Sequence, residues 1–204
     1  FGDGCAEADA PNCHPRLLIK LSKKHDLYFE DEYPLLTKFT DHYQDWRQFL
    51  SDYTKQPVRE AKTMMIKLFY GAQPAIDLPH IRKLSIEVYA AADALLSHPA
   101  NSKWNYLFQD RRNPTFSRLA ALLSFEENDM LQHFQTALTS QKSDLCVLIY
   151  DGALVSCAGL RDEAKLVYAT EMSEEQCGLP MAVKTWPRNV MVQTLPHWLL
   201  RKLT

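Results

Sequence analysis

Three short stretches of this chain carry residue types that could do chemistry together. They are Ala8-Asp9-Ala10-Pro11-Asn12-Cys13-His14-Pro15-Arg16-Leu17-Leu18, Arg59-Glu60-Ala61-Lys62 running to Tyr70-Gly71, and Tyr150-Asp151-Gly152. The first and third are expected to place an aspartate at a strand end, and the second to place two cations and an aromatic ring on one helix face. Two carboxylates that hold metal ions, facing a cationic helix that holds a polyphosphate, are the minimum set of groups for nucleotidyl transfer.

Asp9 and Asp151 are the predicted catalytic residues and metal ligands. In two-metal catalysis, two ions roughly 4 Å apart clamp the attacking and leaving oxygens of an in-line displacement. Mg²⁺ suits this role because it takes hard oxygen ligands, usually one or two carboxylates plus substrate phosphates, and Mn²⁺ is the expected substitute. Taken singly, each aspartate is more typical of an ordinary turn, since Asp beside Gly or Pro is common there.

Arg59, Lys62, Ile66 and Tyr70 follow steps of three, four and four residues, so a helix would place them on one face. The two cations lie near the expected helix start, where the dipole and free amides already favour anions. A triphosphate could bind there, with the Tyr70 ring presented to a base. The alternative is a solvated cationic edge on a helix that serves only the core.

Composition excludes several classes of protein. The chain has 204 residues, 46% of them hydrophobic and 24% charged, as in a globular protein with a core, and its net charge is −2. That charge argues against a free-standing DNA-binding module, which usually has a basic face. There is no P-loop motif and no GxSxG setting for a serine nucleophile, and the histidines lack metal-ligand spacing.

The cysteines, the length of the apolar runs and the first residue predict the compartment and the extent of the chain. Five scattered cysteines without a CxxC pair predict reduced, intracellular thiols. No apolar run is long enough to span a bilayer, and no signal peptide is visible, so no membrane partner is expected. The chain opens with Phe1 rather than Met, and no strand or linker is recognised upstream of Asp9, which together predict a fragment of a longer protein.

Hydrophobic spacing predicts the elements that position these residues. Helices are expected to begin near Leu17, to span 33–53 with a break near Thr40-Asp41, and to cover 58–70, 79–96, 115–138 and 161–176; 98–114 is expected to be a loop. The apolar runs 145–150 and 153–157 predict a hairpin with Asp151 at its tip, and 181–186 a last strand. The tail beyond 187 is expected to cover an apolar patch.

The predicted fold class is α+β, a small antiparallel sheet with helices on one face. The expected division is a first part, 1–32, a mainly helical part, 33–140, and a last part, 141–204, holding the hairpin, a helix and the closing strand.

These stretches resemble the motifs of a known family. The first stretch is similar to Asp-Tyr-Ser-Gln-Ile-Glu-Leu-Arg-x-Leu-Ala-His-Leu-Ser, with matches at Asp9, Arg16, Leu18, Leu21 and Ser22. The second, 58–71, resembles the motif on the O helix, with the same Lys-to-Tyr step, and 150–152 occupies the place of His-Asp-Glu. Asp41-His42 and the 179–186 region are similar to further family segments. The chain thus resembles the palm and fingers of family A DNA polymerases, the DNA polymerase I type, which are related to phage-type single-subunit RNA polymerases.

The resemblance implies a right-hand polymerase fold, DNA-directed DNA synthesis in replication, and a set of roles. Asp9 and Asp151 would bind two Mg²⁺ ions; Lys62 would contact the incoming triphosphate and Tyr70 would stack near the nascent pair. The rest of the implied nucleotide site is Arg59, Ile66 and His14, and the implied primer and template contacts are Tyr150 and Gly71. Primed DNA and nucleoside triphosphates would be the partners, with the thumb and upstream domains outside this fragment.

Four departures from the family pattern keep alternatives open. His14 stands where the DNA enzymes have a glutamate that crowds the ribose 2′-oxygen, and Val58 stands at the most typical arginine position. Gly152 replaces the second acid of the third motif, and 126–129 is acidic where small residues are expected. A catalytically silent relative that binds nucleic acid or protein is the first alternative. The second is a helical interaction domain that uses the aromatic stripe of 33–53 as its contact face.

Overall fold

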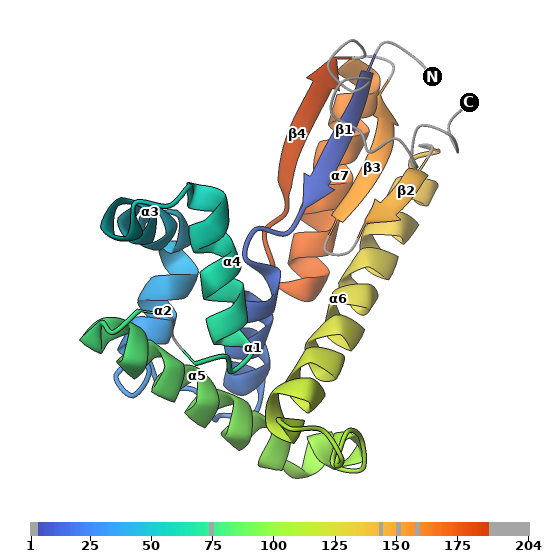
Figure 1. Ribbon diagram of the computed structural model, residues 1–204. Helices are drawn as coiled ribbons and strands as arrows, with labels where there is room; N and C mark the ends of the chain where they lie inside the picture. The colour runs from blue at the N-terminus through green and yellow to red at the C-terminus, as the bar shows by residue number, and fades with distance from the viewer. Residues whose placement is uncertain (1–3, 74–75, 143–144, 150–151, 158–159, 188–204) are drawn as a thin grey trace. The chain divides into compact units, whose positions relative to one another are not determined.

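The computed structural model describes residues 4–73, 76–142, 145–149, 152–157 and 160–187 of the chain. The elements in chain order are β1 (Gly4–Asp9), α1 (Cys13–Lys24), α2 (Pro34–Asp41), α3 (Tyr43–Thr54), α4 (Val58–Phe69), α5 (Pro79–Ser97), the 3₁₀ helix η1 (Pro99–Trp104), α6 (Pro114–Ser140), β2 (Leu145–Ile149), β3 (Gly152–Cys157), α7 (Leu160–Cys177) and β4 (Ala182–Pro187) (Figure 1). They form two units, one of 1–13 with 127–204 and one of 14–126. Whether functional boundaries fall at 32 and 140 stays a prediction.

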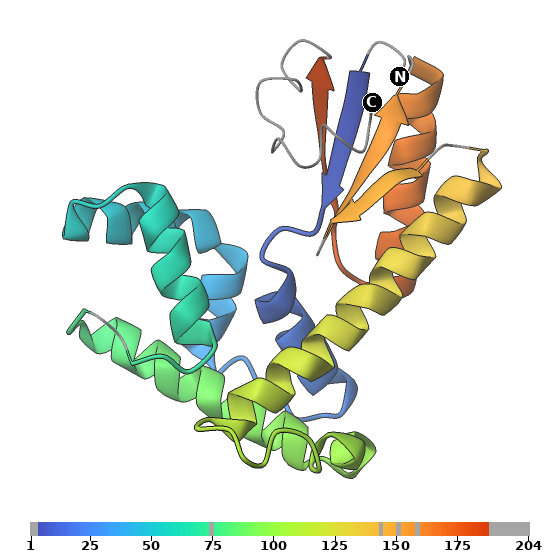
Figure 2. The same ribbon diagram turned by 45° about the vertical axis from the view of Figure 1, so that its right-hand side comes forward.

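The first unit is built on a four-stranded sheet with the order β2-β3-β1-β4. All three neighbouring pairs are antiparallel, so the predicted α+β class and the hairpin of β2 with β3 are confirmed. The second half of α6 and the whole of α7 run along one face of this sheet (Figures 1 and 2).

Small side chains on the central strands let these helices approach the sheet closely. Ala6 and Ala8 of β1, with Ala153 and Val155 of β3, are buried in one cluster with residues of the two helices, namely Phe134, Leu138, Leu166 and Ala169. Because successive strand residues point to opposite faces, Glu7 and Asp9 lie on the face away from the helices. Both are partly exposed, as this alternation requires.

The expectation that no strand precedes Asp9 is wrong, because 4–9 forms the central strand β1. Its alanines carry little strand propensity, and β pairing depends more on cross-strand neighbours than on intrinsic preference. Here β3 pairs with one edge of β1 and β4 with the other, in continuous registers from Gly4 to Asp9. Pairing with both neighbouring strands therefore stabilises β1, although its own residues have low strand propensity.

The second unit is helical, and its elements lie close to those expected from spacing. The predicted break near Thr40-Asp41 separates α2 from α3, and α4 and α5 begin and end within one residue of the predicted bounds. Helix α1 begins at Cys13, four residues earlier than expected, and the 98–114 segment contains η1 as well as turns. Leu36, Leu84, Leu95 and Leu119 are among its fully buried side chains.

A buried carboxylate joins two helices of this unit. Glu87 of α5 is only 5% exposed, and its Oε2 accepts hydrogen bonds from the backbone N–H groups of Leu35 at 2.7 Å and Leu36 at 2.8 Å. These amides belong to the first turn of α2, where no helical partner exists and the residue before Pro34 offers no side-chain cap. Glu87 therefore satisfies the α2 N-terminus and places a negative charge at the positive end of its dipole.

Replacing Glu87 with alanine should lower the free energy of unfolding by about 2 kcal/mol, because hydrogen bonds to a charged acceptor are lost and two amides lose their partner. Urea unfolding followed by circular dichroism measures this. Glu87→Gln keeps an accepting oxygen without the charge and should cost about half as much. If Glu87→Ala were as stable as the unaltered chain, the capping role would be excluded.

Candidate functional site

Asp9 is the last residue of the central strand β1. Its backbone pairs with Gly152, the first residue of β3, on one side and with Ala182, the first residue of β4, on the other. The carboxylate-bearing residue therefore lies where three strands begin or end together, on the sheet face opposite the one that packs against α6 and α7. Its partial exposure leaves it accessible to solvent and solutes.

Packing between β1 and β3 requires a glycine at position 152. From the sequence, Gly152 was noted only as the replacement of an acid. A Cβ atom at this position would lie 2.5 Å from the backbone oxygen of Ala8 and 3.2 Å from both Cα and Cβ of Asp9. The obstructing oxygen belongs to a paired strand, so it cannot rotate aside. The absence of a second acid here follows from the close approach of β1 and β3.

Two predicted site residues, Tyr150 and Asp151, lie outside the described residues. They connect Ile149 to Gly152, which are directly paired at the end of the β2–β3 ladder. In the chain, Asp151 thus immediately precedes the residue that pairs with Asp9. The metal-binding and catalytic roles of both aspartates stay predictions.

The nucleotide-binding residues predicted on α4 share an exposed face. Arg59, Lys62 and Ile66 are exposed, Ile66 to 46%, whereas the opposite face buries Ala61, Met65, Leu68 and Phe69. No salt bridge engages Arg59 or Lys62 within the described part of the chain. The N-terminus of α4 follows Pro57 and has no side-chain cap. Both cations are thus available to an anion near amides that favour one.

Tyr70 is the C-terminal cap residue of α4 and contacts α1. Its hydroxyl is hydrogen-bonded to Nδ1 of His14, and the two rings meet edge to face with centroids 5.8 Å apart at 82°. The Phe69 ring packs against Tyr70 as well, with centroids 5.2 Å apart. The structure therefore brings together two residues that are 56 positions apart in the sequence and that the resemblance assigns to one nucleotide site.

Gly71 fixes the chain just after Tyr70. Its φ of +78° lies in the left-handed region, and a Cβ atom there would come within 2.2 Å of the Phe116 ring and 2.7 Å of the Asn113 amide nitrogen. Backbone and packing thus both require glycine, which ends α4 and closes it against the start of α6. Asn113 and Phe116, which support this corner, are not marked by any short-range sequence pattern.

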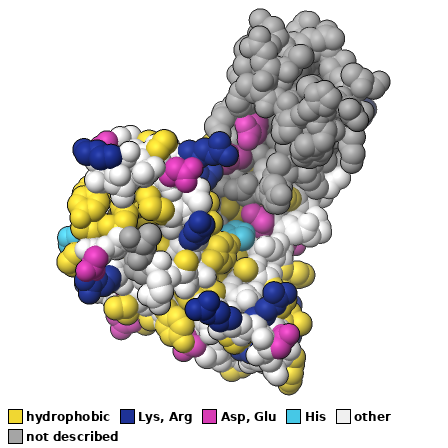
Figure 3. Space-filling view, viewed as in Figure 1, with side chains coloured by type: hydrophobic (Ala, Val, Ile, Leu, Met, Phe, Trp, Pro, Cys, Tyr) yellow, Lys and Arg dark blue, Asp and Glu magenta, His cyan; other side chains and the backbone are white. Residues whose placement is uncertain are grey.

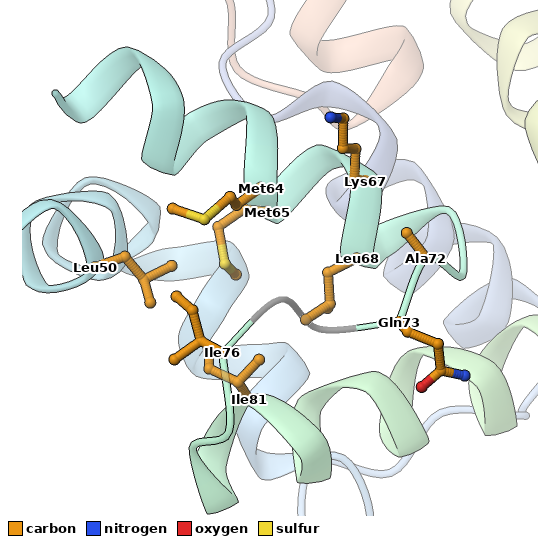
Figure 4. A pocket seen from close by; sticks show the side chains of 9 residues that line it. All are labelled: Leu50, Met64, Met65, Lys67, Leu68, Ala72, Gln73, Ile76 and Ile81. Atoms are coloured by element: carbon orange, nitrogen blue, oxygen red, sulfur yellow. The ribbon is translucent and has the colours of Figure 1, made fainter. Parts of the chain in front are cut away.

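An apolar pocket lies on another side of α4. Its lining comes from α3, α4, α5 and the segment between the last two, and comprises Leu50, Met64, Met65, Lys67, Leu68, Ala72, Gln73, Ile76 and Ile81. Figure 4 shows the leucine, isoleucine and methionine side chains turned toward one another, whereas Lys67 points away. The pocket has no carboxylate or imidazole, so it offers no acid, base or metal ligand and does not coincide with the predicted site.

Among the described residues, no group of three or more His, Cys, Asp or Glu side chains could hold a metal ion. None of the helices there is both long and apolar enough to cross a membrane.

Comparisons with known proteins show a fold and no closer relationship. No protein-family model matches the chain, and no curated protein matches its sequence. Among solved structures, it is similar to the POL domain of Pol1 from M. smegmatis in complex with a DNA primer-template and dNTP, with a TM-score of 0.54 and 14% sequence identity. The similarity covers 89% of this chain but only 39% of that one. The chain therefore has a polymerase-like fold.

Proposed function

We propose that this chain is the palm and fingers portion of a DNA polymerase I-type, template-directed nucleotidyltransferase, and part of a larger, divergent polymerase. The observation that carries the proposal is Asp9 at the end of the central strand, opposite Gly152, within a polymerase-like fold. The cationic face of α4 and the His14–Tyr70 pair support it. Primed DNA and nucleoside triphosphates are the proposed partners.

The donor chemistry at the sheet suits Mg²⁺. Asp9 supplies a partly exposed hard oxygen ligand, and the chain places Asp151 next to the residue that pairs with it. Mg²⁺ is usually bound by one or two carboxylates completed by substrate phosphates, so these two aspartates would hold the ions. When bound, the ions would supply positive charge at the attacking and leaving oxygens and lower the barrier by several kcal/mol.

The residues of the helical unit would bind and orient the nucleotide. Arg59 and Lys62, both exposed, would contact the triphosphate, whose charge the helix start also favours. Ile66, on the same face, presents an apolar surface, and Tyr70 presents a ring that His14 holds in place. Catalysis by such a set depends on positioning and electrostatic stabilisation and needs no covalent intermediate.

Replacing Lys62 with alanine should raise the KM for nucleotide about 30-fold, because one charge-assisted contact to phosphate is worth about 2 kcal/mol. Steady-state incorporation at varied nucleotide concentration measures this. Lys67→Ala is the matched control, since Lys67 is exposed on the same helix but turned to another side. Equal effects of the two substitutions would mean that α4 contributes only general positive charge.

His14→Ala should change the choice between dNTPs and rNTPs. His14 stands where the DNA enzymes have the glutamate that crowds the ribose 2′-oxygen, and the substitution removes its ring together with the contact to the Tyr70 hydroxyl. With the side chain gone, rNTP incorporation relative to dNTP should rise about tenfold, equivalent to about 1.4 kcal/mol. Tyr70→Phe removes the same hydrogen bond but keeps both rings, so it separates the bond from the bulk of His14. An unchanged ratio in both variants would exclude the pair from sugar selection.

A catalytically silent polymerase relative is the second candidate, because position 152 carries no second acid, whatever the reason for its glycine. Primer extension with Mg²⁺ or Mn²⁺ by the parent-length protein, meaning the longer protein proposed to contain this chain, separates the two. Metal-dependent incorporation supports the enzyme. Folded protein that binds primed DNA without incorporating nucleotide under either metal supports the silent relative.

A further inference from the structure

Helix α5 has an inner face that packs in the core and an outer face that stays exposed. The inner face buries Leu84, Val88 and Leu95, whereas on the outer face Ile86 is 67% exposed and Tyr89 is 50% exposed. Figures 1 and 2 show α5 along the lower border of the helical unit, with α2 and α4 above it. In Figure 3, hydrophobic side chains reach the surface at this border beside charged ones. A helix with one buried face is expected to be polar on the other, so this apolar pair calls for a partner.

The outer face of α5 has a symmetric arrangement of residue types. Its exposed residues Arg82, Ile86, Tyr89 and Asp93 follow steps of four, three and four, which lines them up along one seam of a helix. The two apolar residues stand at the centre, and a cation and an anion lie four residues beyond them at opposite ends. A second copy of α5, laid antiparallel, would set each Arg82 against Asp93 of the other copy and each Ile86 against Tyr89 of the other copy.

The residues beside this seam leave room for a second helix. Ser85 and Ala90 stand at symmetric positions as well, so each would meet the other across the contact, and both are small. Packed helices lie about 8–10 Å apart, depending on the size of the side chains between them. Small residues on both sides of Ile86 and Tyr89 therefore allow an approach close enough for these two to interdigitate.

The charged ends of the seam are available to a second copy. In the described part of the chain, no salt bridge involves Asp93. Arg82 pairs with Asp77, but its side chain is still 60% exposed, and a guanidinium has five N–H donors. Arg82 can therefore keep its own partner and contact a carboxylate of the other copy.

The centre of the seam is held in one conformation. The Tyr89 ring packs against Phe116 with centroids 6.0 Å apart. Glu87, on the inner face next to Ile86, accepts hydrogen bonds from two backbone N–H groups of α2 and ties α5 to the unit. Little conformational entropy would be lost when another molecule covers this face.

We propose that the outer face of α5 forms a symmetric, antiparallel contact with α5 of a second copy of this chain. Such a contact is isologous, so each ion pair and each apolar pair occurs twice. A covering segment of different sequence would have no reason to match a two-fold pattern. The inference goes beyond the proposed function, because it uses none of the residues proposed to bind metal or nucleotide.

The contact should be weak and reversible. It involves about six residues of each copy, whereas a standard interface has roughly 20–30 on each side. A dissociation constant on the order of 100 µM is therefore expected, and sedimentation equilibrium of the full chain from about 10 to 500 µM measures it. Ile86→Ser should weaken the association about tenfold, because apolar area is lost twice in each dimer. Val58→Ser, at an exposed position of α4, is the matched control and should change it less than twofold.

The charged ends allow a sharper test. Arg82→Glu and Asp93→Arg should each weaken self-association at least tenfold, because each variant sets like charges against one another twice. An equimolar mixture of the two variants should associate like the unaltered chain, since both ends of the mixed dimer again pair opposite charges. Lys38→Glu makes the same charge change as Arg82→Glu at an exposed position of α2 and should stay within about twofold.

Recovery of association in the mixture, from variants shown by circular dichroism to be folded, supports the antiparallel contact. No association of the unaltered chain, no recovery in the mixture, or equal effects of Arg82→Glu and Lys38→Glu would each overturn it. The parent-length protein should depend on Arg82 and Asp93 in the same way. If it did not associate although the chain alone did, another part of that protein would cover α5, and the proposal would fail.

Primer extension by Ile86→Ser separates this inference from the proposed function. Its extension rate should equal that of the unaltered parent-length protein, because Ile86 lies outside the proposed metal and nucleotide sites. Association without extension in the unaltered protein would contradict the enzyme and leave the α5 contact standing. Extension without association would contradict the α5 contact alone.

Discussion

Asp9→Asn in the parent-length protein is expected to lower metal-dependent primer extension about a thousandfold or more. The substitution removes one negative charge from a position opposite Gly152 while keeping the size of the side chain and the backbone pairing of β1. A ligand lost from a two-metal site removes several kcal/mol of transition-state stabilisation, and each 1.36 kcal/mol changes the rate tenfold. Single-turnover incorporation of one nucleotide on a primed template measures the effect.

Glu7→Gln is the matched control for this experiment. Glu7 lies two residues before Asp9 on the same strand and the same face, and it is also partly exposed. The Glu7→Gln variant should retain primer-extension activity within about threefold. It loses the same charge as Asp9→Asn, but at a residue that binds no metal, so only screened electrostatic interactions change. Direct Mn²⁺ binding, followed by electron paramagnetic resonance, should weaken in Asp9→Asn alone. Equal activity of the two variants would remove Asp9 from the catalytic set.

Helices of this chain were predictable from sequence because each carries a local signal. In α4, Pro57 precedes the helix and Gly71 follows it, and the apolar residues between them repeat at helical spacing. The grouping of Arg59, Lys62 and Ile66 on an exposed face follows from the same period, and their exposure confirms that arrangement. Helical spacing alone cannot show what that face binds, because a cationic helix face that contacts only solvent has the same spacing.

Features that depend on distant partners could not be predicted in this way. Strand β1 exists because β3 and β4 pair with it, and both lie more than a hundred residues further along the chain. The contact of His14 with Tyr70 joins α1 to the end of α4. Local spacing does not encode this contact; only the family resemblance placed the two residues in one site. The 98–114 segment was predicted only as a loop, although it contains the 3₁₀ helix η1.

Restoring an acid at position 152 should damage the protein instead of improving it. The family pattern would suggest Gly152→Glu as a gain of a metal ligand. The structure predicts the opposite, because any Cβ atom there meets the Ala8 backbone oxygen at 2.5 Å. The strands must separate to admit it, which breaks the register that holds Asp9, and overpacking of this kind costs about 3 kcal/mol. Urea unfolding should therefore show a large and similar loss of stability for Gly152→Ala and Gly152→Glu.

Ala182→Glu is the control that separates crowding from charge. Ala182 is the other backbone neighbour of Asp9, and its position already accommodates a Cβ atom. A glutamate there adds the same charge beside Asp9 but should cost no more than about 1 kcal/mol, the usual range for a cross-strand pair. If Gly152→Ala were neutral and only the two glutamate variants were destabilised, repulsion from Asp9 would be the cause. Gly152 would then not be a packing requirement of the sheet, and repulsion between neighbouring carboxylates would explain why no second acid stands beside Asp9.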